Sequence, residues 1–495
     1  MHFCLRPCPY TRHLRVTWGI RHGLAGSFCT PRGLVKYCFP ITLRSVISTK
    51  REARLLTTQS AVAQDLLSRL SNSRLSSDSL FRIVRESSLY ERPIPERHRI
   101  IFYIGHLEAF DWNLLGSSLG LRNFNPEFDR LFAFGIDPVG GGLPSDQPSD
   151  WPSLNAVRDY MCQTRAALDD KLTPDVIDSS LNARDRFPFS TLLNVAIEHR
   201  LMHLETLAYM FHQLPLDRKL PQPEDEPFSA SLMTPRMRAI PSGVATLGLS
   251  RDREDFGWDN EFEIHTVHVP AFEIDQYKVA NHQYLDFINS GGYDRRDLWT
   301  EDGWNWKNGS GISHPLFWKK TSDEWFYRTM FREIPLPLDW PVYVSHAEAS
   351  AYARWAGKSL PTEEQWHRAA YGTPEGSDRR YPWGETIPDA KLGNFDFHRW
   401  DPAPVNTFPQ SASAFGVQGL VGNGWEWTAS IFAPFPGFEA FPFYRGYSAN
   451  FFDGKHFVMK GGSAHTAACM LRPTFRNWFQ SHYQYVYAGF RCVSQ

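Results

Sequence analysis

The chain has 495 residues, too many for one ordinary core, and this length favours two domains of roughly 150 to 250 residues each. Hydrophobic residues make up 42% and charged residues 21%, as is typical of soluble globular proteins. The net charge of -2 argues against nucleic acid or a membrane surface as a partner. No apolar run approaches the ~20 residues that a membrane span needs.

The N-terminal residues differ in composition from the rest. Residues 1–51 contain nine Lys or Arg and neither Asp nor Glu, and four of the seven Cys fall within the first 38 residues. An Arg-rich leader without acids is typical of organelle import, so residues 1–59 are expected to be a transit peptide or a disordered extension. The remaining Cys form no disulfide framework, which favours an intracellular place, cytoplasmic or mitochondrial.

Residues 60–215 show helical periodicity from Ala61 onward, with apolar residues three and four positions apart. The pattern predicts further helices over Phe102–Leu119, Leu154–Lys171 and Phe189–Gln213. Four helices of this length are expected to form a bundle, and bundles build metal sites from side chains on facing helices. The stretch Gly135–Pro152 is rich in Gly, Pro, Asp and Ser and is predicted to be a loop.

The sequence changes character after a linker at 216–240 that is rich in Pro and acids. In residues 241–495 the run Phe262–Val269 is typical of a strand. Amphipathic helices are predicted over Ser345–Gly357 and Thr362–Tyr371. The second domain is therefore expected to be α+β with much irregular loop.

His199 and His203 lie four residues apart in the sequence His199-Arg-Leu-Met-His203-Leu-Glu205, so both imidazoles can reach one ion from the same helix face. The zincin motif is absent, because no Glu follows His199. A third ligand has to come from another helix, and His106 in an apolar helical stretch is the candidate. Its structural alternative is an ordinary core histidine. Three imidazoles suit iron, zinc or copper, so the ligands alone do not select the metal.

These residues resemble a known family. A HxxxHxE pair with an upstream His in a DinB-like four-helix bundle is similar to the EgtB-type sulfoxide synthases of ergothioneine biosynthesis. The second half resembles the formylglycine-generating-enzyme (sulfatase-modifying factor) domain, which has a C-type-lectin-like fold. The runs that carry the likeness are Phe272–Asn281, Pro341–Ala349, Lys358–Trp366, Val421–Thr428, Lys460–Ser463 and Ala488–Cys492.

The resemblance implies an oxidoreductase in which His106, His199 and His203 hold Fe²⁺ and O₂ is a co-substrate. The family couples a thiol to the imidazole C2 carbon of hercynine, which is trimethylated histidine, and oxidises the sulfur to a sulfoxide. It implies small-molecule partners, with a separate methyltransferase that supplies hercynine and a separate lyase that cleaves the product.

The resemblance also implies roles for residues of the second domain. The family places a tyrosine near the iron as a proton or hydrogen-atom donor, and Tyr444 matches that position, with Tyr447 as its rival. The family segment Phe-Arg-Asn-Trp is matched by 475–478, so Arg476, Asn477, Trp478 and the following Phe479 are expected at the substrate. Glu426 is a candidate ligand for a structural Ca²⁺. The structural alternative is a set of ordinary loop and core side chains.

Two departures from the family pattern concern the sulfur donor. Members that use γ-glutamylcysteine carry an acid where this chain has Phe479, and an arginine-rich loop where Gly135–Pro152 contains no Arg. Both favour a smaller donor such as cysteine, or a selenosugar as in the related selenoneine synthase. Met202 replaces a Gln of some members. The copper-binding Cys pair of true formylglycine-generating enzymes is not matched, because only Cys469 lies in that region.

Three other functions stay open at this stage. The chain could form a carbon–selenium bond for selenoneine, act as a lectin-like binding protein without catalysis, or be a DinB-like zinc hydrolase or thiol transferase. Incubation with hercynine, Fe(II) and either cysteine or a selenosugar separates the first from sulfoxide synthesis. Metal analysis and O₂ consumption separate the others.

Overall fold

The computed structural model describes residues 43–133, 143–181, 187–223, 228, 232–252 and 255–494, with side chains from Ala61 onward except those of 179–181. The predicted leader thus lies outside the described residues, apart from the backbone of its last 17 positions, 43–59, which is helical. Part of the Arg-free loop and part of the linker also lie outside them.

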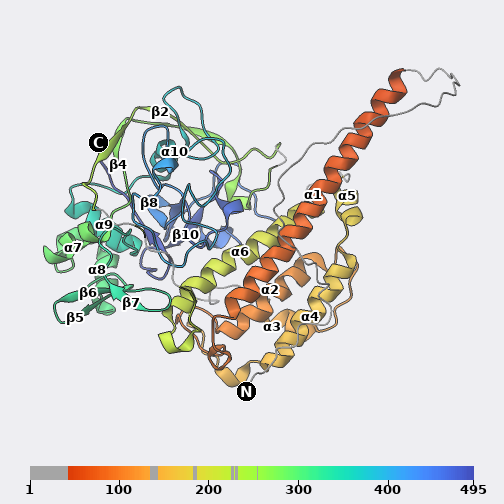
Figure 1. Cartoon of the computed structure of the whole chain (residues 1–495), viewed down its shortest axis with the longest axis horizontal. Coiled ribbons are helices and arrows are strands. Elements are labelled where there is room, and N and C mark those ends of the chain that lie inside the picture. The colour runs from red at the N-terminus through yellow and green to blue at the C-terminus, as the bar shows by residue number, and fades with distance from the viewer. Residues whose placement is uncertain are drawn as a thin grey trace, which may run out of the picture. The chain divides into compact units, whose positions relative to one another are not determined.

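The described residues of the N-terminal half form mainly helices (Figure 1). Two predicted helices, Leu154–Lys171 and Phe189–Gln213, are confirmed to the residue, and the helix predicted from Phe102 spans Ile100–Leu115. Ser153 accepts a hydrogen bond from the backbone of Ala156 and so caps its helix. The helices are α1 (Leu43–Phe81), α2 (Ile100–Leu115), α3 (Pro126–Leu131), α4 (Leu154–Lys171), α5 (Pro174–Leu181) and α6 (Phe189–Gln213).

Residue contacts divide the chain into two compact units. The first comprises Met1–Arg69, Ile104–Phe134 and Pro152–Leu193; the second comprises Leu70–Tyr103, Gly135–Trp151 and Asn194–Gln495. Within the first unit, Tyr160 of α4 donates a hydrogen bond of 2.7 Å to Asp129 of α3. Arg165 of α4 pairs at 2.8 Å with Glu108 of α2. The α4 helix thereby contacts α3 through Tyr160 and α2 through Arg165.

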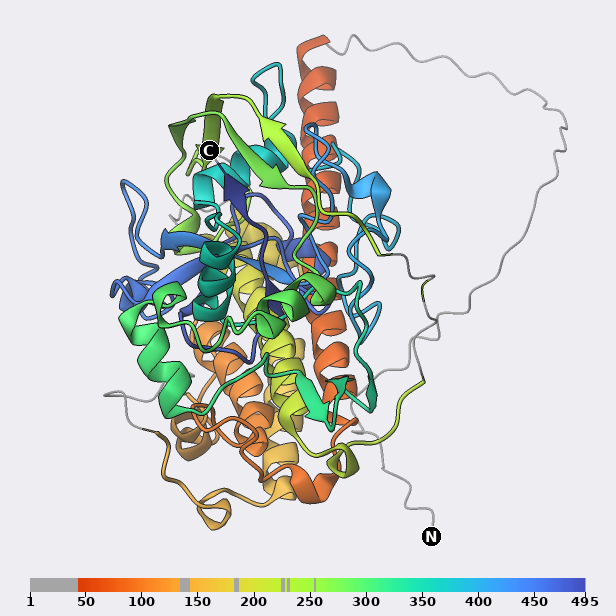
Figure 2. The same ribbon diagram turned by 90° about the vertical axis from the view of Figure 1, so that its left-hand side faces the viewer.

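The second unit contains short strands and helices set among long loops, as Figures 1 and 2 show. Its sheets are β1-β4-β12, β10-β9-β8-β11, the pair β2-β3 and β5-β6-β7. The strands are β1 (Met237–Ile240), β2 (Gly243–Leu247), β3 (His265–Val269), β4 (Phe272–Asp275), β5 (Trp318–Thr321), β6 (Glu324–Arg328), β7 (Glu333–Pro335), β8 (Trp425–Ile431), β9 (His456–Lys460), β10 (Asn477–Gln480), β11 (Ala488–Gly489) and β12 (Val493–Ser494).

Four helices belong to the same part: α7 (Asn281–Asn289), α8 (Glu301–Gly309), α9 (His346–Trp355) and α10 (Glu363–Tyr371). Both predicted helices are confirmed, and each begins at a capping box, Ser345 with Glu348 and Thr362 with Gln365. Gly357 follows α9 with a φ of +68°, a conformation that suits glycine at a helix C-terminus. The α10 helix packs on the β2-β3 pair around the buried Trp366.

Candidate metal centre

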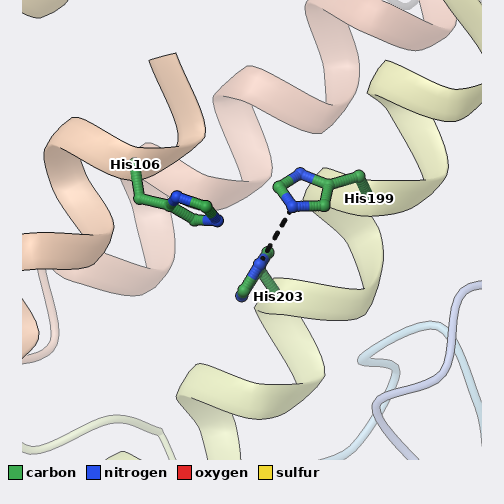
Figure 3. Close-up of side chains that lie close together, drawn as sticks. All are labelled: His106, His199 and His203. Carbon is green, nitrogen blue, oxygen red and sulfur yellow. Dashed lines mark hydrogen bonds between the residues drawn. The ribbon is translucent and has the colours of Figure 1, made fainter. Parts of the chain in front are cut away.

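His199 and His203 lie on α6, one turn apart, and both are buried. Their Nε2 atoms are 3.1 Å apart (Figure 3). For a metal–nitrogen bond of about 2.1 Å, two imidazole nitrogens at right angles round one ion lie about 3 Å apart. The pair therefore has the separation that two ligands of one metal ion require.

His106 lies on α2 and is also buried. Its Nδ1 atom is 2.7 Å from the carbonyl oxygen of Phe132. A carbonyl oxygen only accepts, so Nδ1 donates this hydrogen bond, and in the neutral ring the lone pair is left on Nε2. Such an outer hydrogen bond is what holds a metal-ligating imidazole in its tautomer and orientation.

The three histidines form one group, in which each residue offers a ring nitrogen and these nitrogens all lie within 4.8 Å of one another. In Figure 3 the ring of His106 points from its helix toward the His199–His203 pair. Three neutral nitrogen donors in a buried group fit a first-row ion such as ferrous iron, and they leave other coordination positions for substrates. The residues present thus fit the metal that the family resemblance implies.

A second face of α6 carries a stripe of side chains at spacings of four, three, four and three residues, which keeps them on one side of the helix. All of them contact residues beyond position 250. These contacts run from Trp258 at one end to Tyr487 at the other. The stripe consists of Glu198, Met202, Glu205, Tyr209 and His212.

Glu205 is the central residue of this stripe, and its carboxylate is enclosed by donors. It accepts hydrogen bonds from Trp425 Nε1 at 2.7 Å, Ser463 Oγ at 2.5 Å and Thr466 Oγ1 at 2.8 Å. Burial raises the pKa of Glu205, although these three donors oppose that shift. The Glu of the HxxxHxE pattern therefore fixes α6 against the loop that follows β9.

Tyr444 and Tyr447 differ in their surroundings. The ring of Tyr444 is half-buried and lies 6.2 Å from the ring of His199. Tyr447 is buried, stacks on Trp258 with ring centroids 4.0 Å apart, and its hydroxyl donates to the sulfur of Met202 at 3.5 Å. Burial raises the pKa of Tyr447 well above its usual value. Of the two, Tyr444 is the one whose ring contacts a histidine of the group.

The expected substrate segment spans the start of β10, where neighbouring side chains point to opposite faces. Trp478 stacks on Phe432 at 4.1 Å, with an interplanar angle of 6°, and meets the ring of Tyr447 edge-on at 5.4 Å. Asn477 accepts a hydrogen bond from the backbone N–H of Trp478. Phe479 stacks on Tyr483 at 4.8 Å. The structure thus brings Trp478, but not Phe479, against the loop that carries Tyr444 and Tyr447, here called the tyrosine loop.

Two other predicted site residues have structural partners. Arg476 is buried, and its guanidinium makes two hydrogen bonds of 3.0 Å to Glu363. Glu426 is fully buried and accepts hydrogen bonds from Arg491 and from Trp366 Nε1. Burial opposes ionisation of Glu426, but the charges of Arg491 and Lys278 outweigh it and lower its pKa. Two cations already balance this carboxylate, so the structure does not support Glu426 as a calcium ligand.

The C-terminal part of the chain is similar to a known protein family. Residues 223–495 match the family model described as the sulfatase-modifying factor enzyme 1-like domain. The expected relation to that domain is confirmed. The range includes Tyr444, Trp478 and the partners of Glu205.

Relatives extend the match into the helical part. The hercynine oxygenase of Mycolicibacterium smegmatis is 35% identical over 375 residues, which cover 74% of this chain and 83% of that protein. The chain belongs to the hercynine oxygenase family. The hercynine oxygenase of Mycobacterium tuberculosis is 41% identical over 248 residues, 50% of this chain and 57% of that protein. Ergothioneine biosynthesis protein 1 of Neurospora crassa is 27% identical over 500 residues, 83% of this chain and 55% of that protein.

The expected family is thus confirmed, while the roles of single residues and the DinB-like bundle stay predictions. The sequence analysis of this hercynine oxygenase homologue did not predict that Tyr103 lies beside the histidine group. Tyr103 is fully buried, and its ring is 5.7 Å from that of His203. Its position three residues before His106 could have indicated this, because residues i and i+3 share a helix face. No helix within the described ranges is long and apolar enough to cross a membrane.

Proposed function

We propose that the chain is a ferrous-iron-dependent hercynine oxygenase that joins the sulfur of cysteine to the imidazole C2 carbon of hercynine in ergothioneine biosynthesis. The hydrogens of the thiol and of C2 leave with one oxygen atom of O₂ as water, and the other oxygen atom becomes the sulfoxide. The observation that carries the proposal is the buried His106–His199–His203 group in a chain of this family. We propose that the helices form a DinB-like bundle around it.

When bound, ferrous iron would supply O₂ activation and about three open positions beside its three histidine ligands. The chain's own residues would bind and orient the ion and the substrates. The carbonyl of Phe132 keeps the Nε2 lone pair of His106 available, as described above. All three imidazoles are buried, and it is the neutral imidazole that binds a metal ion.

Tyr444 is proposed as the proton donor at the reacting oxygen. Its ring lies beside His199, and its side chain is half-buried. Tyr447 is the weaker candidate, because its hydroxyl donates to Met202. A general acid has to reach the reacting atom at hydrogen-bond distance, and this requirement favours Tyr444.

The rings of Phe432, Tyr447 and Trp478 support a place for the quaternary ammonium group of hercynine. Trp478 is half-buried and contacts both other rings. Aromatic faces attract such cations by the ring quadrupole, with about 0.5 to 2 kcal/mol per contact. We propose that Asn477 binds the amino-acid end of the substrate.

The test is reconstitution of the full chain with Fe(II), O₂ and hercynine, with cysteine, γ-glutamylcysteine or a selenosugar as donor in parallel. The expected result is O₂ consumption and a hercynine–cysteine sulfoxide identified by mass spectrometry. A selenium-containing product alone would replace sulfoxide synthesis by selenoneine formation. Bound zinc, no O₂ consumption and no coupled product with any donor would overturn the proposal.

A further inference from the structure

Trp258 joins the helix of the histidine pair to the loop of the two tyrosines. Its side chain is fully buried, and its Nε1 atom donates a hydrogen bond of 2.8 Å to Glu198 Oε2. Glu198 directly precedes His199 on α6. The Nε1 end of the indole is thereby hydrogen-bonded to the turn of α6 that carries His199.

The other contacts of the indole are with the tyrosine loop. Its ring stacks on Tyr447 with centroids 4.0 Å apart at 25°, and lies 6.4 Å from the ring of Tyr444 at 67°. A single rigid side chain thus contacts the α6 turn before His199 and both tyrosines.

The residues after Trp258 hold the indole in place. Asp259 accepts a hydrogen bond of 2.6 Å from Ser448 Oγ, next to Tyr447. Glu261 accepts a hydrogen bond from the backbone N–H of Trp258 at 2.9 Å, and its other oxygen accepts from Arg472 Nε at 2.8 Å.

Arg472 closes this network because it also binds Glu198, with Nη1 at 2.8 Å and Nη2 at 3.0 Å from the two carboxylate oxygens. Glu198 and Glu261 are both buried, and Arg472 neutralises part of their charge. A buried network whose members are all hydrogen-bonded gives a rigid, unique arrangement. The indole is therefore fixed from both sides.

We propose that Trp258 is a positioning residue that sets the distance between Tyr444 and the His199–His203 pair and so decides whether the sulfoxide or a simply oxidised thiol is formed. The proposal rests on the function proposed above. Trp258 acts through Tyr444 and Glu198, without contacting the substrate itself. A misplacement of a donor by about 1 Å costs up to roughly 100-fold in rate, so a rigid spacer has a large effect.

The test uses Trp258→Phe, which keeps an aromatic ring for the stack on Tyr447 but removes the Nε1–H donor to Glu198. The matched control is Trp299→Phe, because Trp299 is also buried and donates from Nε1 to the carbonyl of Gly292 at 3.0 Å, beside the ring of Tyr293. In metal-free protein with 3-fluorotyrosine at position 444, Trp258→Phe is expected to shift or broaden the ¹⁹F signal. Trp299→Phe is expected to leave it unchanged.

In the iron-loaded enzyme, Trp258→Phe should lower the ratio of sulfoxide to oxidised thiol about tenfold, while iron content and O₂ consumption stay within twofold of the unsubstituted chain. Combined with Tyr444→Phe it should give no further fall, because the two act as one unit. A merely structural role would lower iron content and all activities together. That result, or an unchanged ¹⁹F signal, would overturn the proposal.

Ser448→Ala is the second variant, in case Trp258→Phe does not fold. It removes only the hydrogen bond between the tyrosine loop and Asp259. Ser448→Ala is expected to change the ¹⁹F signal and the product ratio in the same direction as Trp258→Phe, but less. Because the ¹⁹F measurement needs neither metal nor substrate, failure of the positioning proposal is distinguishable from failure of the proposed function.

Discussion

The Nδ1 atom of His106 lies 2.7 Å from the carbonyl oxygen of Phe132, a residue that follows α3 directly. This contact holds the buried imidazole in the tautomer that carries its lone pair on Nε2, the nitrogen that can bind an ion. An ordinary core histidine needs only its hydrogen bonds. His106 differs, because a ring nitrogen of His199 and one of His203 lie within 4.8 Å of its own ring nitrogen. This grouping favours a metal ligand over an ordinary core histidine.

His203→Ala should abolish iron loading, because it leaves two ligands of three. The measurement is iron content after anaerobic incubation with Fe(II) and desalting. The control is His268→Ala, because His268 is an exposed residue of β3 and should not affect iron. Retained stoichiometric iron and activity in His203→Ala would exclude the ligand assignment.

Tyr444→Phe should slow sulfoxide formation about 100-fold and favour simple oxidation of the thiol, in line with the usual contribution of a general acid. Tyr447→Phe loses only a weak hydrogen bond to the sulfur of Met202 and should change the product ratio less than threefold. Products are quantified by mass spectrometry after equal O₂ consumption. Equal ratios in Tyr444→Phe and the unsubstituted enzyme would move the role to another residue.

Cysteine should be preferred over γ-glutamylcysteine by at least about tenfold in kcat/KM. The acid that γ-glutamylcysteine-dependent relatives are expected to carry is replaced by Phe479, whose ring stacks on Tyr483 and lies 5.9 Å from the guanidinium of Arg97. An aromatic ring offers no hydrogen bond to the γ-glutamyl group, and a polar substrate group left without a partner lowers kcat/KM for that donor. Equal kcat/KM values for the two donors would contradict this assignment.

Lys219 should make folding stability depend on pH. The residue is 2% exposed, and its ammonium donates to the carbonyl of Phe211 at 3.1 Å. Burial, with the nearby charge of Arg328, lowers the pKa of Lys219 from 10.5 to about 7. Between these values the unfolded chain binds a proton that the folded chain does not, so this residue makes stability rise with pH across that window.

Lys219→Met should remove this dependence. Relative to Lys219→Met, the unsubstituted chain should gain stability between pH 7 and 10, by roughly 4 kcal/mol at most, at about 1.4 kcal/mol per pH unit. Denaturant unfolding at several pH values measures the difference. Lys320→Met, at an exposed position of β5, is the control and should show no such slope. A difference that stays constant with pH would contradict the buried ammonium.

Glu426→Gln should destabilise the chain by about 3 kcal/mol, because it leaves the buried cations Arg491 and Lys278 without their counter-charge. Removal of calcium with a chelator should leave the melting temperature unchanged. Thermal unfolding of both proteins with and without chelator measures these effects. A fall in melting temperature on chelation in the unsubstituted protein alone would restore the calcium hypothesis.

Much of the local structure follows from the sequence. The apolar spacing predicts the full extent of α4 and α6, and the capping residues Ser345 and Thr362 mark the starts of α9 and α10. These features depend on neighbours within a few positions along the chain. Short-range patterns therefore suffice for them.

The surroundings of the site depend on partners far along the chain. Glu198 and Trp258 are 60 positions apart, and Glu205 and Ser463 are 258 apart. A polar residue in an apolar helix gives no indication of which distant group will bind it. The role of Trp258 and of the polar stripe on α6 could therefore be inferred only from the three-dimensional structure.

The stripe of Glu198, Met202, Glu205, Tyr209 and His212 also bears on where the chain can be cut. The change in composition along the sequence predicts a domain boundary in the linker after α6. Residue contacts instead group α6, from Asn194 onward, with the C-terminal part. A fragment starting in the linker would expose Trp258, Trp425 and the guanidinium of Arg472 where α6 now covers them. Such a truncated chain should be poorly soluble, and a fragment that begins before Phe189 should be more soluble.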